Sequence, residues 1–185
     1  RSSEISKEEQ IINQAIKFHS EGNISEAAKY YQLFVDQGFK NHIVFSNYGT
    51  ILKRLGKLQD AELFTRKAIE LNPDYANAHS NLGNILQDLG KPKEAELSLR
   101  QAIQLNPNFA NAHSNLGITL KDLGKLKEAE LSQRKAIELN PGFANAHSNL
   151  GTVLKDLGKL KEAESSLRQA IQINPNFAIA YSNLG

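Results

Sequence analysis

The sequence of 185 residues contains no cysteine, no methionine and no tryptophan, and only 7% of its residues are aromatic. Without cysteine the chain forms no disulfide and no thiolate zinc site, which fits a reducing compartment. Its 22 basic and 20 acidic side chains leave a formal net charge of only +2, so the basic excess typical of nucleic-acid binding is missing. No apolar run approaches the roughly 20 residues that span a bilayer. We therefore expect a cytoplasmic protein without nucleic-acid or membrane partners.

What the sequence does contain is a repeat of 34 residues. The tetrad Ser-Asn-Leu-Gly ends at Gly83, Gly117, Gly151 and Gly185. Most positions of residues 76–109 are identical in residues 110–143. A fixed period of this length is typical of solenoids, in which each unit packs only on its neighbours. Such a molecule presents a binding surface rather than an enclosed active site.

Each repeat is predicted to contain two helices. Apolar or small residues recur at steps of three and four over residues 77–89 and again over residues 93–105, which is the periodicity of amphipathic helices. Gly90 follows the first run, where a left-handed residue can close a helix. Pro92 falls in the first turn of the second run, where no backbone donor is missed.

The spacing of particular residues resembles the tetratricopeptide repeat family. Counted from Ala76, the positions that define this family hold His79, Leu82, Gly83, Leu86, Gly90, Ala95, Leu99, Ala102 and Pro107. The resemblance implies an all-α fold, a right-handed α-solenoid of stacked antiparallel helix pairs. We expect a single solenoid domain over residues 1–185, with a degenerate repeat at 8–41, repeats at 42–75, 76–109, 110–143 and 144–177, and the start of a further, truncated repeat at 178–185.

Two repeat positions predict how the helices pack. Gly83 lies in the middle of a helix, where glycine costs about 1 kcal/mol relative to alanine. We therefore predict that a neighbouring helix approaches closely at this position. Thr65 and Gln133 stand where the family has a large apolar side chain, so we expect looser packing in their layers.

A column of histidines, His79, His113 and His147, raises the alternative of a metal site. Equivalent helices of neighbouring repeats lie roughly 8–10 Å apart, which is too far for two rings to share one zinc at about 2.0–2.1 Å each. We expect partly buried histidines that pack between helices, and we predict neither a metal nor a cofactor.

The candidate binding residues are asparagines at position 6 of every repeat, which we call the asparagine ladder. The ladder consists of Asn13, Asn47, Asn81, Asn115, Asn149 and Asn183. The resemblance implies that this position points into the concave groove of the solenoid. A carboxamide both donates and accepts hydrogen bonds, so it can pair with a peptide backbone of any sequence. At about 3.3–3.6 Å per residue, an extended peptide would meet a ladder residue about every third residue.

Other polar side chains are predicted to flank the ladder in a mildly basic groove. They are Asn77, Asn111 and Asn145 at position 2, Ser80, Ser114 and Ser148 at position 5, Asn84 at position 9, and Lys121 and Lys155 at position 12. The alternative is that the asparagines only form hydrogen bonds between neighbouring helices. The residues leave both roles open.

The sequence predicts an interaction scaffold that binds a protein or peptide, not an enzyme. The Gly-Lys pairs lack the upstream glycine and the following Ser or Thr of a phosphate-binding loop. The ladder and the Ser-Asn-Leu-Gly tetrads also resemble the superhelical domain of the O-linked N-acetylglucosamine transferases. The alternative function is thus a substrate-recruiting arm of a larger enzyme, such as a glycosyltransferase, a sulfotransferase or a methyltransferase.

The two ends of the sequence lead to a further expectation. The absence of methionine and the stop within residues 178–185 indicate a piece of a longer repeat protein. Natural solenoids end in a polar capping helix. We therefore expect end-to-end self-association through uncapped terminal repeats, and a self-assembly element is the remaining alternative function.

Overall fold

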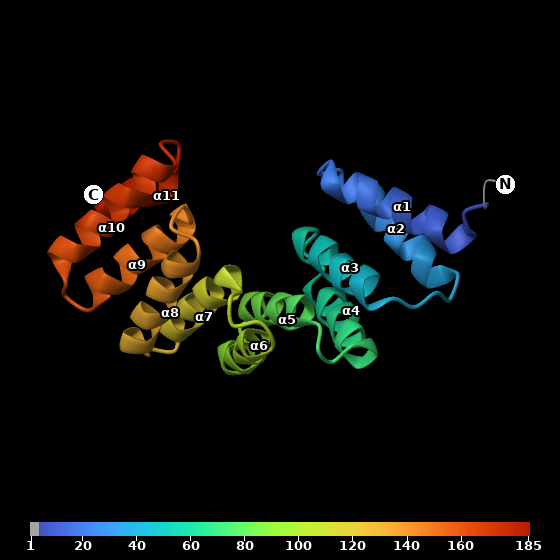
Figure 1. Ribbon diagram of the computed structural model, residues 1–185, viewed down its shortest axis with the longest axis horizontal. Helices are drawn as coiled ribbons and strands as arrows, with labels where there is room; N and C mark the ends of the chain where they lie inside the picture. Colours follow the sequence, from blue (N-terminus) through green and yellow to red (C-terminus); the bar gives the residue numbers. More distant parts are fainter. Residues whose placement is uncertain (1–3) are drawn as a thin grey trace. The chain divides into compact units, whose positions relative to one another are not determined.

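The computed structural model describes residues 4–185, which form eleven α-helices and no strand. The helices are α1 (Lys7–Ser20), α2 (Ile24–Asp36), α3 (His42–Arg54), α4 (Leu58–Leu71), α5 (Ala76–Asp88), α6 (Pro92–Leu105), α7 (Ala110–Asp122), α8 (Leu126–Leu139), α9 (Ala144–Asp156), α10 (Leu160–Ile173) and α11 (Ala178–Leu184) (Figure 1). The prediction of an all-α repeat solenoid is confirmed.

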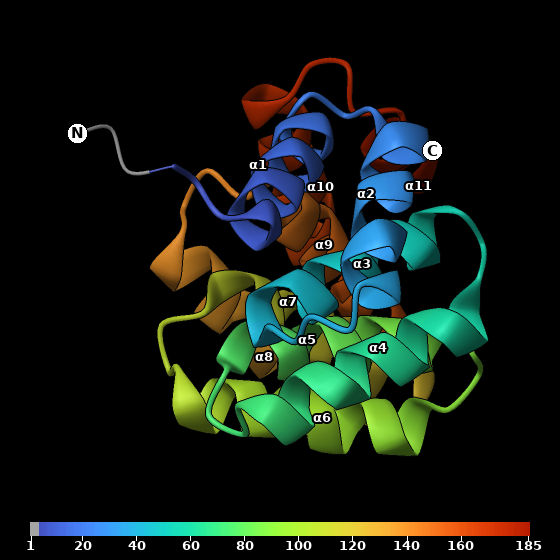
Figure 2. The same ribbon diagram turned by 90° about the vertical axis from the view of Figure 1, so that its right-hand side faces the viewer.

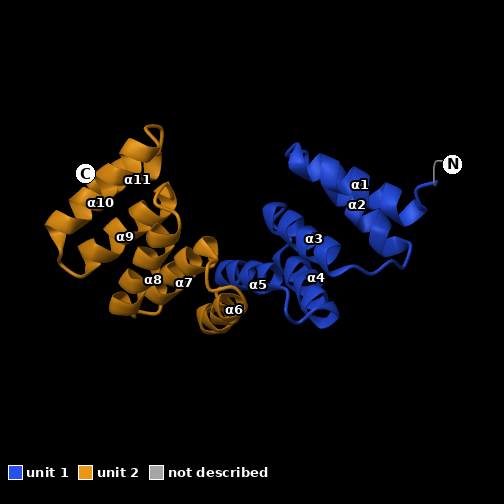
Figure 3. Ribbon diagram, viewed as in Figure 1, with its two compact units in different colours: residues 1–89 blue, residues 90–185 orange. Residues whose placement is uncertain are grey.

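The chain divides into two compact units, residues 1–89 and residues 90–185 (Figure 3). In the first unit, α2 packs against α1 and α3, and α4 packs against α3 and α5. In the second unit, each helix from α7 to α10 packs against the helices before and after it in the chain (Figure 2). The single domain over residues 1–185 stays a prediction, and residues 1–3 lie outside the described part.

First helices of successive repeats also contact one another directly within each unit. These contacts join α3 to α5 in the first unit, and α9 to both α7 and α11 in the second. The first helices α3, α5, α7, α9 and α11 begin at the residues where the sequence predicts repeats to begin. Equivalent side chains on successive first helices therefore lie in rows within each unit.

Glycine closes the first helix of each repeat, as expected for Gly90. That residue has φ +73°, and Gly56 has φ +76°, in the left-handed region that favours glycine. The N–H of Lys57, just after Gly56, donates to the carbonyl of Leu52 at 2.9 Å. This hydrogen bond satisfies a carbonyl that the helix end would otherwise leave unpaired.

Glycines in the middle of the first helices allow the two helices of a repeat to approach closely. A Cβ on Gly117 would lie 2.5 Å from Nε2 of Gln133, and a Cβ on Gly151 would lie 2.6 Å from Cγ of Leu167. On Gly151 it would also lie 3.2 Å from the carbonyl oxygen of Ala163, which belongs to the backbone of the second helix. The predicted close approach is thus present in these two repeats.

The layers of Thr65 and Gln133 are not loose, so this expectation is wrong. Both side chains are fully buried. The hydroxyl of Thr65 donates to the carbonyl of Ala61 at 2.8 Å. Gln133 donates through Nε2 to the carbonyl of Ser114 at 2.8 Å and accepts from the Ser114 hydroxyl at 2.9 Å. These polar side chains are tolerated because their hydrogen bonds offset the cost of burial.

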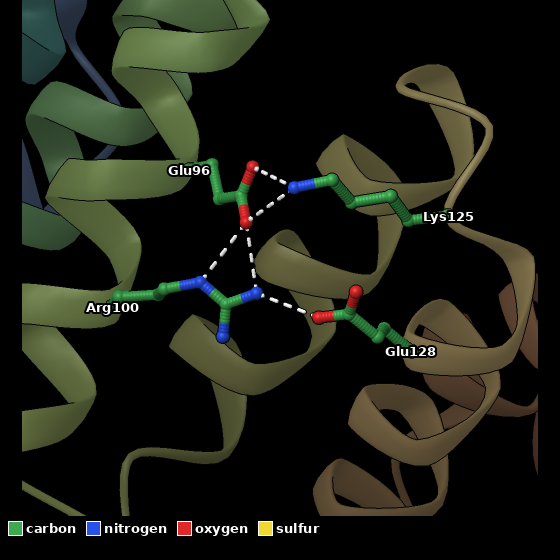
Figure 4. A network of polar contacts seen from close by, with 4 residues as sticks. All are labelled: Glu96, Arg100, Lys125 and Glu128. Carbon is green, nitrogen blue, oxygen red and sulfur yellow. Dashed lines mark hydrogen bonds and ion pairs between the residues drawn. The ribbon is translucent and has the colours of Figure 1, made fainter.

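Ion pairs connect the second helices of successive repeats in the second unit. The carboxylate of Glu96 accepts from Nζ of Lys125 at 2.9 Å and from Nη2 of Arg100 at 2.8 Å (Figure 4). Arg100 in turn donates to Glu128 at 2.8 Å. The same arrangement recurs one repeat later around Glu130. The mixed charges on this surface are therefore paired with one another.

These pairs lower the pKa of both central carboxylates below the ordinary value of 4.5. Desolvation alone would raise the pKa of Glu96, but the hydrogen bonds from Lys125 and Arg100 outweigh it. For Glu130 the hydrogen bond from Lys159 is the largest cause, and Arg134 adds to it. Each carboxylate thus stabilises the fold in its charged form.

We predict that the fold loses stability as the pH falls below about 4.5, because a lowered pKa contributes stability that is lost on protonation. The double substitution Glu96→Gln and Glu130→Gln should reduce the free energy of unfolding at pH 7. It should also flatten the dependence of that free energy on pH below 4.5, as measured by urea unfolding followed by circular dichroism. Glu164→Gln is the control, since Glu164 pairs with Arg168 of its own helix. Equal slopes in the double variant and the parent would contradict the prediction.

A second prediction concerns the close approach of the paired helices. Gly151→Ala should lower the free energy of unfolding by roughly 1–3 kcal/mol, because overpacking outweighs the better helix propensity of alanine. Gly142→Ala is the matched control, since a Cβ there meets only an ordinary contact at 3.6 Å with Asn140. Thermal unfolding of the two variants checks the prediction, which fails if Gly151→Ala is as stable as the control.

Candidate functional site

The asparagine ladder lies on the first helices of the repeats, with three members in each unit. Asn13, Asn47 and Asn81 lie on α1, α3 and α5, and Asn115, Asn149 and Asn183 lie on α7, α9 and α11. Asn13 is exposed, and the other five are half-buried. Each unit thus carries its own three-membered row of carboxamides with access to solvent.

Two ladder asparagines form hydrogen bonds to a serine of the preceding repeat. Nδ2 of Asn81 donates to the hydroxyl of Ser46 at 2.9 Å, and Nδ2 of Asn149 donates to the hydroxyl of Ser114 at 3.4 Å. These bonds join first helices of successive repeats, so the structural role left open by the sequence is present. A carboxamide has a second N–H and an acceptor oxygen, so one such bond does not exhaust it.

Asn47 is connected to the preceding repeat through a tyrosine instead of a serine. Tyr31 is fully buried, and its hydroxyl lies 2.9 Å from Nδ1 of His19. Burial raises the pKa of Tyr31 to about 12, while a hydrogen bond with Asn47 acts in the opposite direction. Burial and the nearby charge of Arg54 lower the pKa of His19. Both rings are therefore neutral at physiological pH, and Asn47 is held by an uncharged buried group.

The serines predicted to line the groove do not lie on an accessible surface. Ser80, Ser114 and Ser148 are all buried, because position 5 faces the neighbouring helices. This corrects the expectation that they contact a peptide directly. Ser114 binds both Asn149 and Gln133, whereas the hydroxyl of Ser148 has no hydrogen-bond partner among residues 4–185. The serines therefore lie beneath the ladder, on its buried side.

The remaining predicted residues differ in their accessibility. Asn77, Asn111, Asn145 and Lys155 are exposed, whereas Asn84 and Lys121 are half-buried. The ammonium group of Lys121 forms an ion pair with Asp156 of the next repeat at 3.5 Å. The region around the ladder is therefore less basic than the sequence alone suggests, since one of its two lysines is paired.

The three histidines of the column are half-buried, as predicted, but each contacts the loop before its helix. Nε2 of His79, His113 and His147 lies 2.7–2.9 Å from the carbonyl of the proline six residues earlier. A carbonyl can only accept, so Nε2 carries the proton in each ring. Residues 4–185 contain no group of three or more His, Cys, Asp or Glu side chains that could bind a metal ion.

Sequence models of the tetratricopeptide repeat match most of the chain, over residues 44–75, 76–109, 98–130 and 144–177. With the helix pairs and their close packing, these matches show that the chain belongs to the tetratricopeptide repeat family. Proteins of this family are typically non-catalytic scaffolds for protein–protein interaction. No curated protein matches the chain.

Several solved structures share the fold. YrrB, described as a tetratricopeptide repeat protein with an unusual peptide-binding site, is 25% identical with a TM-score of 0.71, over 93% of this chain and 89% of YrrB. TTC0263, a thermophilic tetratricopeptide repeat protein of Thermus thermophilus, is 18% identical with a TM-score of 0.79, over 96% of both chains. MamA of Desulfovibrio magneticus RS-1 is 20% identical with a TM-score of 0.78, over 95% of this chain and 99% of that one.

None of the helices within residues 4–185 has the length and apolar character needed to cross a membrane. The cytoplasmic location and the end-to-end self-association stay predictions.

The two serines behind the ladder lead to opposite predictions. Ser148→Ala should raise the free energy of unfolding by about 1 kcal/mol, because it removes a buried hydroxyl without a partner. Ser114→Ala should lower it by about 1–3 kcal/mol, because it leaves buried groups of Gln133 and Asn149 unpaired. Urea unfolding of both variants checks the pair of predictions. If both variants change the free energy of unfolding in the same direction, the hydrogen bonds of the two serines do not determine their contribution to stability.

Proposed function

We propose that the chain is an interaction scaffold that binds an extended segment of a partner protein through the asparagine ladder. The observation that carries this proposal is the attachment of half-buried ladder carboxamides to a group of the preceding repeat, as for Asn81 on Ser46 and Asn149 on Ser114. A side chain held in one orientation loses less conformational entropy when it binds a ligand.

The chemistry of the ladder favours a peptide backbone as its ligand. After one N–H is given to a serine, a carboxamide can still donate one hydrogen bond and accept others, which matches the N–H and C=O groups of an extended chain. First helices of successive repeats lie about 8–10 Å apart, which corresponds to about three residues of extended peptide. Identical carboxamides cannot distinguish different side chains. The ladder therefore favours sequence-tolerant binding, with specificity supplied by groups around it.

The accessible flanking residues extend the same surface in the second unit. Asn111 and Asn145 are exposed on the first turns of α7 and α9, and Lys155 is exposed near the end of α9. These side chains add further donors, and Lys155 adds a positive charge that suits a partner segment with acidic residues. The similarity to YrrB, itself described as having a peptide-binding site, supports a peptide as the class of ligand.

The proposal is tested by panning a random-peptide display library against the parent chain and against an Asn115→Ala, Asn149→Ala variant. Removing two ladder residues should lower the affinity for the retained peptides by about tenfold or more, at roughly 1 kcal/mol for each lost hydrogen bond. Circular dichroism must show that the variant is folded at the panning temperature. Binding of individual retained peptides is then measured by fluorescence anisotropy.

Two control variants separate ladder binding from indirect effects. Gln104→Ala changes an exposed amide on the second helix α6 and should leave peptide binding unchanged. Ser114→Ala keeps both ladder carboxamides but frees that of Asn149, so it should weaken binding less than the double variant. The proposal is wrong if the parent retains no peptide, or if the folded double variant binds the retained peptides as tightly as the parent.

A further inference from the structure

A pocket in the first unit contains none of the ladder asparagines. It has a volume of about 340 Å³ and lies beside the loop between α2 and α3, against one side of α4. Its apolar lining consists of Val35, Phe39, Phe45, Phe64 and Leu71. This volume falls in the range of about 300–1,000 Å³ that is typical of ligand sites.

The aromatic lining is a departure from the later repeats of this chain. Positions 4 and 23 hold Phe45 and Phe64 in the second repeat, whereas the three later repeats have histidine and serine there. Phe39 stands where each of the four following repeats has proline. Three aromatic residues that the later repeats lack thus meet at one pocket. The corresponding pockets of the second unit contain His113 or His147 and serines instead.

The rings support one another but do not close the pocket. Phe45 is buried, and its ring centroid lies 5.7 Å from that of Phe64 and 6.3 Å from that of Phe34. Phe39 and Phe64 are only half-buried, so each leaves part of an aromatic ring accessible. Accessible aromatic surface around an unfilled volume is typical of a binding site for an apolar group.

The charges at the rim favour an acidic neighbour for that apolar group. Lys40, Lys67 and Glu70 line the pocket, and neither lysine forms an ion pair within residues 4–185. In the second unit, Lys135 and Glu138 occupy the repeat positions of Lys67 and Glu70, and they form an ion pair at 2.8 Å. Lys67 instead lies over the ring of Phe64, with Nζ 5.1 Å from the ring centroid. An unpaired ammonium group is therefore held at the aromatic wall.

We propose that this pocket binds a partner peptide through a bulky aromatic side chain with an adjacent acidic residue. The ring enters between Phe39, Phe45 and Phe64, and the carboxylate meets the ammonium groups of Lys40 and Lys67. Burial of a large ring supplies most of the affinity, while the ion pair at the exposed rim contributes orientation more than affinity. This site does not depend on the ladder. It would let the junction between the first two repeats select a particular partner side chain, which identical asparagines cannot do.

The test uses the full chain, labelled with ¹⁵N, and the acetylated peptide amide Ser-Phe-Glu-Ser as the probe. Binding should shift the backbone amides of residues 35–45 and 64–71 in a titration followed by nuclear magnetic resonance. The matched peptides Ser-Ala-Glu-Ser and Ser-Phe-Gln-Ser should bind more weakly, the first by about tenfold or more. Phenylacetate is a further arm, because a small aromatic acid offers the same chemistry without a peptide.

Variants of the chain assign the binding to the pocket. Phe64→Ser introduces the residue that three other repeats carry at this position. It should lower the affinity for the Ser-Phe-Glu-Ser peptide by about tenfold. Lys67→Gln leaves the aromatic wall in place and should remove the preference for Glu over Gln. Lys135→Gln is the matched control in the second unit and should leave the affinity at the pocket unchanged. Asn81→Ala reports separately on binding at the ladder, which would shift amides near Asn47 and Asn81.

The proposal is overturned if the peptide shifts no amide at the pocket, or if it shifts the ladder residues instead. Unchanged affinity in both Phe64→Ser and Lys67→Gln would overturn it as well. Phenylacetate binding as tightly as the peptide would assign the pocket to a small aromatic acid and refute the peptide. Loss of binding in Asn81→Ala alone would place the peptide on the ladder, so failure of this proposal remains distinguishable from failure of the proposed function.

Discussion

Within a repeat, the two helices meet where a glycine of the first helix faces a side chain of the second. At Gly151 the second helix lies so close that an added Cβ would meet both Leu167 and the carbonyl of Ala163. Because a helix of about 13 residues is marginal by itself in water, each helix pair depends on such packing for its stability. The same packing fixes which positions of the two helices are buried.

The ladder depends on this same packing. Once a first helix is seated on its partner, position 5 faces inward and position 6 faces partly outward, so a buried serine lies beside a half-buried asparagine. The serine of one repeat then accepts from the asparagine of the next, as between Ser46 and Asn81. Position 24 can join this network when it is polar, as Gln133 does through Ser114. The ladder and the stacking of repeats therefore share their hydrogen bonds.

The parts of the structure that follow from local chemistry were accessible from the sequence. Periodicity and the glycines that close the helices predicted the helix pairs, and the glycine within the first helix, argued from Gly83, predicted the close approach found at Gly117 and Gly151. Ser46 was missed as a partner of the ladder, although it lies 34 residues before Ser80 in the same repeat register. The bond between Gln133 and Ser114 could not be predicted, because it depends on rotamers of two side chains on different helices. The expectation of loose layers failed for this reason, since residue type alone does not reveal a satisfied hydrogen bond.

The aromatic pocket illustrates a different limit of sequence reasoning. Phe45 and Phe64 fit the apolar face of an amphipathic helix, and Phe39 lies in the loop between α2 and α3, so each by itself predicts only a packing position. What distinguishes them is that they depart together from the later repeats and converge on one volume. In a protein built from near-identical units, generic contacts arise from what the units share. Discrimination between partners must arise where the units differ, and in this chain three such differences surround the pocket of the first unit.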